Sequence, residues 1–426
     1  MHSKAAIPKT VALNKYLPDE TKSAEHCNEE NTMAINKDLM IEGFLKTYGG
    51  DRDGIEVYFA PGQVNLLGDH TDYNGGHVLP VALTLGTYAA IRRNDTNLCH
   101  VASAQFPEDG IYEFPLAEQR PDRDIFWVNY PMGSLWSMIA HGHRPSCGFD
   151  IFFDSTLPLN SGLSSSASII TVTIYSIMKM YGFEGISPID LVLINQDAEN
   201  SFLNVGCGIL GAFMSVFGKK DNAIYLKASS LHFKYTPLSL LGKHIVVTNS
   251  GIKHANMNEL FSECLNDCRK GFKYLSDNLP IMRLCDVTSD QYETYKDMIP
   301  MPQVRSRVKH VVYENQRVMQ AYNALYVGNI TRFGKLMNDS HVSLRDDFGA
   351  SCPEVDYLIE AAWDTPGVIG SRITGVGFGG CTVSIVENNA IENFIESVGN
   401  TYTEKTGRKA EFYIAETGDG AHEVTA

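Results

Sequence analysis

Four polar side chains lie within five residues in the first quarter of the sequence, and together they could bind a ligand rich in hydroxyl groups. The segment "APGQVNLLGDHTDYNGGHVLP", residues 60–80, contains Asp69, His70, Asp72 and Tyr73. Carboxylates accept hydrogen bonds and an imidazole can donate or accept them, which suits a polyhydroxylated ligand. An ordinary polar turn after a strand explains the local cluster equally well.

A second segment, "LPLNSGLSSSASI" at residues 157–169, has the composition of an anion-binding loop. Backbone N–H groups of a small-residue loop at the start of a helix can surround a phosphate, and serine hydroxyls add donors or a ligand for Mg²⁺. No lysine follows a glycine at the required spacing, so this is not a Walker A loop. The alternative is a serine-rich helix cap that binds no ligand.

A third segment, "TGVGFGGC" at residues 374–381, has four glycines within six residues. Glycine allows the backbone to approach another group closely. On its own this segment is a weak signal, because a bulged hairpin has a similar composition. Its place after the other two segments gives it weight.

The elements that must position these segments alternate between helices and strands. Helical spacing begins near Met40, and "IEVYFAPG" is typical of a strand. Further along we predict a buried strand pair at 79–95, a strand, loop and long helix at 149–182, helices at 256–275 and 304–324, and a strand, glycine-rich turn and strand at 371–387. This alternation predicts an α/β or α+β fold.

Two lobes are expected, dividing between residues 235 and 245. We assign residues 38–240 to an N-terminal lobe with the first two segments, and residues 241–426 to a C-terminal lobe with the third. Residues 1–37 are polar and weakly periodic, which indicates an N-terminal extension outside both lobes.

The composition argues against several classes of partner. The chain has 426 residues and a formal net charge of −15, which argues against nucleic acid but leaves room for a local pocket for a small anion. The nine cysteines have no zinc-site spacing, which indicates reduced thiols. No signal-peptide core or membrane-length apolar run is present, so we expect a cytoplasmic protein without a membrane partner.

Together and in this order, the three segments resemble the GHMP kinases, and specifically the galactokinase family. "NLLGDHTDYNGGHVLP" is similar to the galactokinase signature, and "GLSSSAS" and "RITGVGFGGCTV" are similar to the second and third family motifs. "VYENQRV" and "NDSHVSLRDDF" also resemble galactokinase segments, most of all bacterial ones. The resemblance runs from about Phe44 to Val424.

The resemblance implies a two-lobe α+β fold with the active site in a cleft between the lobes, and ATP and Mg²⁺ as cofactors. The implied ATP-contacting residues are Ser103, Trp127, Asn160, Ser161, Gly162, Leu163, Ser164, Ser165 and Ser166. The implied sugar-contacting residues are Asp69, His70, Thr71 and Asp72. Ser166 and Glu199 are the implied Mg²⁺ ligands, and Mg²⁺ prefers oxygen donors. Trp127 also suits core packing.

The catalytic positions depart from the family pattern. Gln63 stands at the family's catalytic Arg, Gly211 at its catalytic Asp, and Met257 at a sugar-binding Tyr, so no catalytic residue is retained at these three positions. The losses fall where the anomeric hydroxyl and the transferred phosphate would lie. The other changes are Asp69 for Glu, Asn160 for Gly, Ala212 for Gln, and Leu260 and Phe261 for two Arg.

We therefore favour, at this stage, a catalytically impaired or inactive member of the family. Such a pseudokinase would bind ATP with Mg²⁺, and galactose or a related sugar as a candidate second ligand, and act as a sensor or regulator of sugar metabolism with an unidentified protein partner. One alternative is an active kinase for the anomeric hydroxyl of galactose or a related sugar, with Asp69 as a replacement base. The other is a structural or interaction protein that binds neither ligand.

Overall fold

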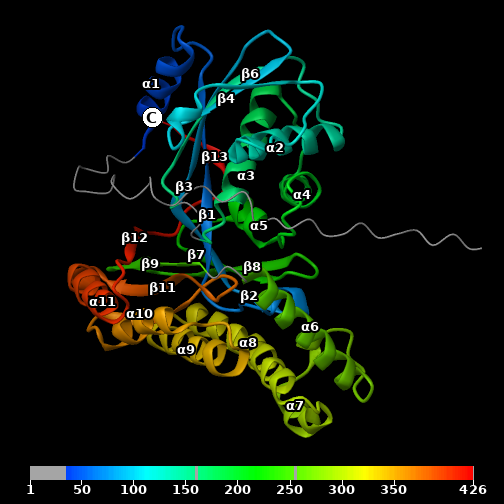
Figure 1. Cartoon of the computed structure of the whole chain (residues 1–426), viewed down its shortest axis with the longest axis vertical. Coiled ribbons are helices and arrows are strands. Elements are labelled where there is room, and N and C mark those ends of the chain that lie inside the picture. The colour runs from blue at the N-terminus through cyan, green and yellow to red at the C-terminus, as the bar shows by residue number, and fades with distance from the viewer. Residues whose placement is uncertain (1–34, 159–161, 254–256, 426) are drawn as a thin grey trace, which may run out of the picture. The chain divides into compact units, whose positions relative to one another are not determined.

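The sequence motifs lie in or beside three β-sheets (Figure 1). The computed structural model describes residues 35–158, 162–253 and 257–425. The first sheet has the order β13-β1-β3-β6-β4-β5, with β1 (Glu56–Asn65), β3 (Pro80–Arg93), β4 (Leu98–Ser103), β5 (Tyr112–Pro115), β6 (Phe149–Ser155) and β13 (His422–Glu423). The second has the order β10-β11-β9-β12, with β9 (Lys243–Lys253), β10 (Val368–Ile373), β11 (Gly379–Glu387) and β12 (Glu411–Ala415). The third joins β2 (His77–Val78), β7 (Asn222–Lys227) and β8 (His232–Pro237).

The helices pack around these sheets. Those that precede the second sheet in the chain are α1 (Lys37–Tyr48), α2 (Asn129–Ala140), α3 (Ser165–Tyr181), α4 (Pro188–Asp197) and α5 (Leu210–Phe217). Those that follow β9 are α6 (Met257–Ser276), α7 (Ser289–Tyr295), α8 (Pro302–Tyr326), α9 (Ile330–Ser343), α10 (Pro353–Asp364) and α11 (Ile391–Thr406).

Helix α3 lies against the first sheet because its apolar residues recur at helical spacing. Ile170, Ile174 and Ile177 have no exposed surface and belong to one core cluster with Ile91 of β3 and Ile151 of β6. Burying a side chain of this size contributes about 1.5–3 kcal/mol. The helix therefore has a fixed position, and so does the serine-rich loop that leads into it.

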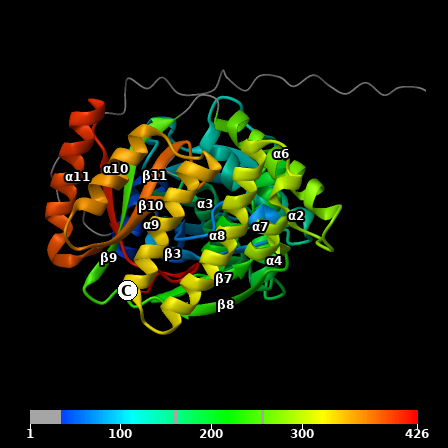
Figure 2. The same cartoon turned by 90° about the horizontal axis from the view of Figure 1, so that it is seen from below.

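Helices α8 to α11 cover the second sheet in the same way, and Figure 2 shows them beside β9, β10 and β11. Val318 of α8 and Phe333 of α9 are fully buried with Val247 of β9 and Val383 of β11. This packing places the inner face of α8 next to the end of β1.

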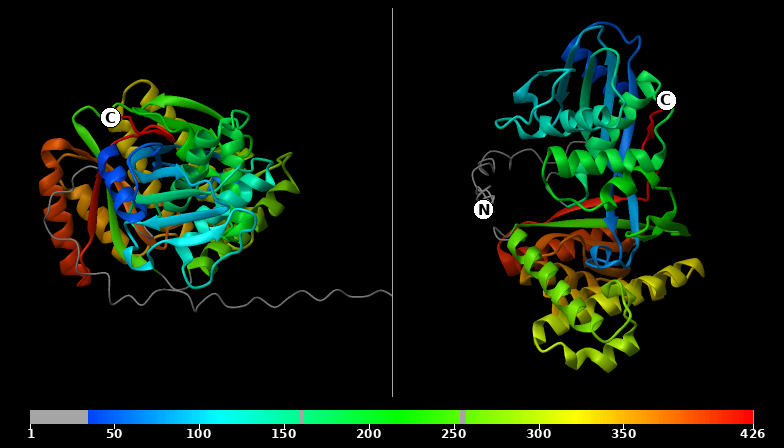
Figure 3. Two further views of the ribbon diagram at one scale, coloured as in Figure 1. Left: turned by 90° about the horizontal axis from the view of Figure 1, so that it is seen from above. Right: turned by 90° about the vertical axis from the view of Figure 1, so that its right-hand side faces the viewer.

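Strand β1 carries the first motif from the first sheet toward α8. In the right-hand view of Figure 3, the blue chain of β1 runs down to a blue turn beside the yellow and green helices. The pairing of β1 with β3 shifts register between Pro61 and Gln63, so a bulge interrupts the ladder there. Beyond the bulge, the backbone N–H of Gln63 donates to the carbonyl of Leu163 at 3.0 Å. The bulge thus joins the first motif to the serine-rich loop.

The predicted α+β class is confirmed, and one element differs from its prediction. Residues 80–93 form the single strand β3 instead of a strand pair. Gly86 lies within this strand, where a Cβ atom would stand 2.3 Å from the carbonyl oxygen of Ala60. This glycine serves close approach to β1 and not a turn.

The lobe boundary at residues 240 and 241 stays a prediction, and it falls between β8 and β9. The C-terminal strand β13 does not stay with the second sheet, since it pairs with β1 of the first. Most of the predicted extension, residues 1–34, lies outside the described residues, and α1 begins at Lys37 after its N-cap Asn36. Among the described helices, none has the length and apolar composition needed to cross a lipid bilayer.

Candidate functional site

The turn after β1 is fixed by its own hydrogen bonds. The Thr71 hydroxyl lies 2.7 Å from the carbonyl oxygen of Gly68 and 2.6 Å from that of His77. A short 3₁₀ turn, Asp72–Asn74, follows and closes at Gly75, whose φ of 82° is a left-handed conformation that favours glycine. The polar residues predicted to contact a sugar therefore lie on a rigid turn.

Asp69 is buried and forms an ion pair with Arg372 of β10. The amide of Asn65 donates to the other carboxylate oxygen of Asp69 at 2.7 Å. Burial raises the pKa of Asp69, while Arg372 and Asn65 act in the opposite direction. Both oxygens of this carboxylate are engaged, so Asp69 holds the turn against β10 and is poorly placed to act as a base.

Glu314 of α8 also holds this turn in place. Its carboxylate accepts from the backbone N–H of Gly68 at 2.9 Å, from the Ser340 hydroxyl at 2.7 Å and from Arg317 at 2.7 Å. Burial alone would raise the pKa of Glu314, but Arg317 and the other partners lower it to about 2. This charged hydrogen-bond network fixes the distance between the turn and α8.

His70 presents a neutral imidazole beside an aromatic wall. Burial lowers the pKa of His70 to about 3, and its Nδ1 lies 2.8 Å from the Tyr73 hydroxyl. Its ring stacks on Phe348 at a centroid distance of 4.2 Å and lies 6.1 Å from the ring of Phe261. Phe348 comes from the π turn Leu344–Phe348 that ends α9. The wall is apolar, and it includes Phe261, one of the two residues predicted to replace arginines.

Met257, at the predicted sugar-binding position, begins α6 and is partly buried against the core cluster of α6 and α8. Leu260 and Phe261 pack on the same cluster. Phe261 also lies 5.8 Å from the ring of Tyr73. Helix α6 therefore closes one side of the turn with apolar side chains.

The serine-rich loop meets the start of α3 as predicted, and its first two predicted residues, Asn160 and Ser161, lie outside the described residues. Gly162 has a φ of 75° and Leu163 is buried. Ser164 precedes α3, and Ser165 is the first residue of this 17-residue helix. The free N–H groups at the start of α3 make this end of the helix suited to bind an anion.

Ser164 lies between Gln63 and Gly211, the two positions that the resemblance assigns to catalytic residues. Its φ of 60° is left-handed, and its hydroxyl accepts from the amide of Gln63 at 3.0 Å. A Cβ atom on Gly211 would lie 3.0 Å from this hydroxyl oxygen and 3.0 Å from the Cβ of Ala167. Gln63 and Gly211 therefore converge on one serine, and neither supplies a charge there.

Ser166 and Glu199 form the second predicted pair. The Ser166 hydroxyl donates to a carboxylate oxygen of Glu199 at 2.6 Å. Glu199 is buried in the π turn Ala198–Phe202, a geometry that is frequent at functional sites. Burial raises the pKa of Glu199, and the hydrogen bond from Ser166 lowers it.

This hydroxyl and carboxylate fit Mg²⁺, which takes oxygen ligands and keeps several waters or phosphate oxygens. Among the described residues, no group of three or more His, Cys, Asp or Glu side chains could hold a metal ion. A metal at Ser166 and Glu199 would therefore take its other ligands from water and from the nucleotide phosphates.

Ser103 and Trp127, the other predicted nucleotide residues, lie near each other around β4 and β6. Trp127 is buried, stacks on Phe106 at 5.9 Å and donates its indole N–H to Asp109 at 2.8 Å. Ser103 ends β4, where its hydroxyl accepts from the N–H of Gln105 at 3.2 Å. Core packing accounts for Trp127 as the structure stands.

Sequence reasoning missed the residues that hold the site together. Arg372, Glu314 and Asn65 were inside quoted motifs, but no role followed from the local pattern because their partners lie on other elements. The sequence signal for each was a polar or charged residue within a largely apolar strand or helix face.

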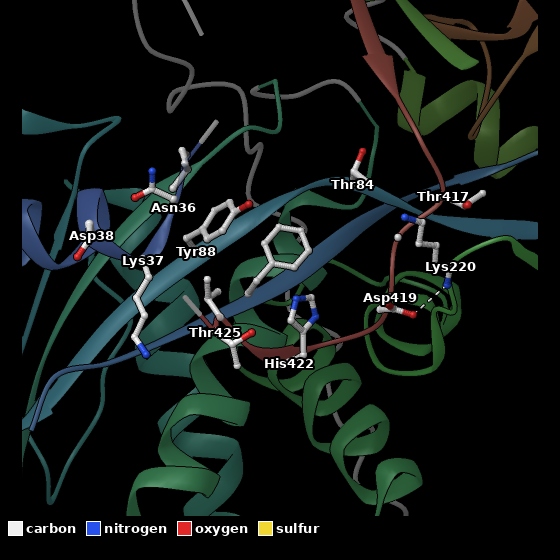
Figure 4. Close-up of a pocket in the computed structure, with 14 residues that line it drawn as sticks. Asn36, Lys37, Asp38, Thr84, Tyr88, Lys220, Thr417, Asp419, His422 and Thr425 are labelled. Carbon is white, nitrogen blue, oxygen red and sulfur yellow. Dashed lines mark hydrogen bonds between the residues drawn. The ribbon is translucent and has the colours of Figure 1, made fainter. Parts of the chain in front are cut away.

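A cavity of about 620 Å³ is lined by none of the predicted site residues (Figure 4). Phe59 of β1, Tyr88 of β3 and His422 of β13 are among its lining residues, and the ring centroid of Phe59 lies 4.7 Å from that of Tyr88 and 5.4 Å from that of His422. The groups suited to phosphoryl transfer thus do not lie in this cavity.

Comparison with protein families assigns three regions of the chain. Residues 42–93 match the galactokinase galactose-binding signature, residues 129–219 the GHMP kinase N-terminal domain, and residues 321–404 the GHMP kinase C-terminal domain. The first match contains the turn with Asp69 and Asp72, and the second contains the serine-rich loop and Glu199.

Individual proteins match over most of the chain. The galactokinase of Bacillus subtilis is 40% identical to it, over 90% of this chain and 98% of that protein. The galactokinase of Clostridium acetobutylicum is 42% identical, over 86% of this chain and 94% of that protein. The structure of Lactococcus lactis galactokinase complexed with galactose has a TM-score of 0.83 at 33% identity, covering 91% of this chain and 99% of that one. The mevalonate kinase of Methanococcus jannaschii, at 16% identity and a TM-score of 0.62, shares the fold.

Proposed function

Because the chain belongs to the galactokinase family, we propose that it is an ATP-dependent kinase for the anomeric hydroxyl of galactose or a related sugar. The observation that carries the proposal is the preserved pair of binding elements: the rigid signature turn on α8 and β10, and the Ser166–Glu199 pair at the start of α3. Relatives about 40% identical over most of the chain favour this active enzyme over the inactive protein that the sequence analysis favoured.

In this proposal the two elements bind the two substrates. The N–H groups at the start of α3 and the hydroxyls of Ser164 and Ser166 bind the ATP phosphates. Bound at Ser166 and Glu199, Mg²⁺ would neutralise charge on the phosphate oxygens. The signature turn binds the sugar through Asp72 and His70, while Asp69 keeps that turn in place.

The expected reaction is slow. Phosphoryl transfer depends on positioning and charge, and an arginine on the transferred phosphate is worth about 10³–10⁵-fold. A general base is worth about 10²–10⁴-fold. Gln63 supplies a hydrogen-bond donor without charge, so we expect turnover well below the roughly 1–100 s⁻¹ that is usual for kinases.

One observation favours a second candidate, the pseudokinase. Gln63 and Gly211 form an uncharged group around Ser164, in which the Gln63 amide nitrogen already donates to the Ser164 hydroxyl. A protein that binds ATP and a sugar without transferring phosphate would have this arrangement.

The test is phosphorylation of D-galactose and a panel of other aldoses, with ATP and Mg²⁺ at high protein concentration and sugar 1-phosphate detected by ³¹P NMR. A Ser166→Ala/Glu199→Gln variant purified in parallel measures contaminating kinase. Product above this control supports the proposal. Binding of ATP and sugar without product supports the pseudokinase. Thermal unfolding measures this binding, because a ligand at about 100 times its Kd adds about 2.7 kcal/mol to the free energy of unfolding. No shift with either ligand indicates a structural protein.

A further inference from the structure

The cavity of about 620 Å³ is lined by no residue of the two elements proposed to bind ATP and sugar (Figure 4). Its lining comes from the start of α1, from β1 and β3, from the turn between α5 and β7, and from residues 417–425. Small-molecule sites usually have volumes of about 300–1,000 Å³. The cavity is therefore large enough for a ligand of monosaccharide size.

Two threonine hydroxyls on one side of the cavity are left as hydrogen-bond donors. An isolated bridge between Leu83 and Thr417 brings Thr84 close to Thr417. The Thr84 hydroxyl accepts from the N–H of Glu416 at 3.0 Å, and the Thr417 hydroxyl accepts from the N–H of Asp221 at 2.8 Å. Because each oxygen already accepts a bond, and no described residue accepts from either hydroxyl, each can donate its proton to a ligand.

Lys220 adds a positive charge beside these hydroxyls, and Figure 4 shows it next to Thr417. Among residues 35–158, 162–253 and 257–425, no carboxylate forms an ion pair with its ammonium group. The Asp419 carboxylate of the same cavity accepts from the backbone N–H of Lys220 at 2.9 Å, and Asp38, the other lining carboxylate, pairs with Arg52. Both carboxylates are therefore engaged, while the ammonium group and the hydroxyl protons stay available, which favours an anionic ligand.

Aromatic rings near these donors suit the ring of a sugar. The ring of Phe59 is tilted by 54° to that of Tyr88 and by 52° to that of His422, and apolar ring faces pack well on such groups. The Tyr88 hydroxyl has no hydrogen-bond partner among the described residues. The His422 Nδ1 lies 2.7 Å from the Gly420 carbonyl oxygen, which can only accept, so the neutral imidazole keeps Nε2 as an acceptor for a sugar hydroxyl.

We propose that this cavity binds a monosaccharide phosphate, at a second site separate from the signature turn and the start of α3. The phosphate lies against Lys220, Thr84 and Thr417. The sugar ring lies against the aromatic group, where Tyr88 donates to one of its hydroxyls and His422 accepts from another. The assignment does not depend on the kinase activity proposed above, because it uses none of the residues that carry that proposal.

Calorimetric titration with galactose 1-phosphate and with glucose 6-phosphate tests the site. A non-hydrolysable ATP analogue, Mg²⁺ and galactose are kept in excess, so that binding at the proposed kinase site is blocked. We expect Lys220→Met to weaken binding of the sugar phosphate about 10–100-fold, the usual effect of losing a hydrogen bond between charged groups. Lys219→Met is the matched control, since Lys219 is also exposed but its ammonium lies 5.3 Å from the ring centroid of Tyr235 and does not line the cavity.

Tyr88→Phe tests the sugar half of the site with little risk to the fold. It keeps the ring beside Phe59 and removes a hydroxyl that no described residue binds. We expect it to weaken binding of the sugar phosphate about 2–10-fold and to leave binding of inorganic phosphate unchanged.

Three results would overturn the proposal. The first is no binding of either sugar phosphate while the ATP analogue and galactose are present. The second is an equal loss of affinity in the Lys219 and Lys220 variants. The third is inorganic phosphate binding as tightly as the sugar phosphates, which would leave an anion site without a place for the sugar. Failure of the kinase proposal looks different, because ATP and galactose would then give no sugar 1-phosphate while the titration still showed binding that depends on Lys220.

Discussion

Replacing Gly211 with alanine tests whether the site has closed around Ser164. The added Cβ atom would stand 3.0 Å from the Ser164 hydroxyl oxygen, 3.0 Å from Ala167 Cβ and 3.2 Å from Ser164 Cβ. Overpacking of this kind costs about 1–3 kcal/mol. Alanine is also the better helix former, which returns about 0.5–1 kcal/mol because Gly211 lies in α5. We expect Gly211→Ala to lower the free energy of unfolding by up to about 2.5 kcal/mol.

A double-mutant cycle isolates the contact. Ser164→Gly removes two of the three close contacts, and glycine tolerates the φ of 60° at this position. In that background Gly211→Ala should be nearly neutral or stabilising. The coupling energy between the two changes should therefore be about 1–2 kcal/mol, measured by urea unfolding followed by tryptophan fluorescence.

Two results would refute this reasoning. A coupling energy below about 0.5 kcal/mol would mean that Ser164 does not oppose a side chain at position 211. Stabilisation by Gly211→Ala alone would mean that the space is open. In either case an acidic side chain at 211 would meet no obstacle, and Gly211→Asp would be the direct test of restored turnover.

Three further predictions concern the charges that hold the turn. Arg372→Met leaves Asp69 buried without a counter-charge, so urea unfolding should show a loss of about 3–5 kcal/mol, and adding Asp69→Leu should recover part of it. The pKa of Glu314 is depressed to about 2, so the ionised carboxylate stabilises the fold above its ordinary pKa and this stabilisation is lost as pH falls. The loss of unfolding free energy caused by Glu314→Gln should therefore be full at pH 7 and shrink between about pH 4.5 and 2. The pKa of Asp72 is raised to about 6, so its contribution to stability is present below its ordinary pKa and is lost as pH rises through 6. Asp72→Asn should therefore gain stability relative to the unmodified protein across that range. A difference in unfolding free energy that does not change with pH would contradict this.

Local sequence patterns were sufficient to predict most helices and strands, but not which residues they contact in the fold. The glycine-rich turn between two apolar runs correctly predicted the hairpin of β10 and β11, and the serine-rich start correctly predicted α3. Residues 80–93 were misjudged because close approach between strands also requires glycine, as Gly86 shows.

The site was predictable as a set of residues but not as a network. Asp69 pairs with Arg372 on a strand that no local pattern connects to it, so its proposed role as a base could be judged only once the pair was seen. The common contact of Gln63 and Gly211 with Ser164 likewise depends on a bulge in β1 and on the start of α5. Such contacts depend on tertiary packing, which residue spacing does not encode.

The pairing of β13 with β1 has a consequence for synthesis on the ribosome. Tyr58 pairs with Glu423 and Phe59 with His422, and the Val424 N–H donates to the carbonyl of Val57. A ribosome adding about 5–20 residues per second reaches these partners roughly 20–70 s after β1. During that time one edge of the first sheet has no strand beside it, and unpaired edges invite association between nascent chains. The first sheet is therefore completed only when nearly the whole chain has been synthesised.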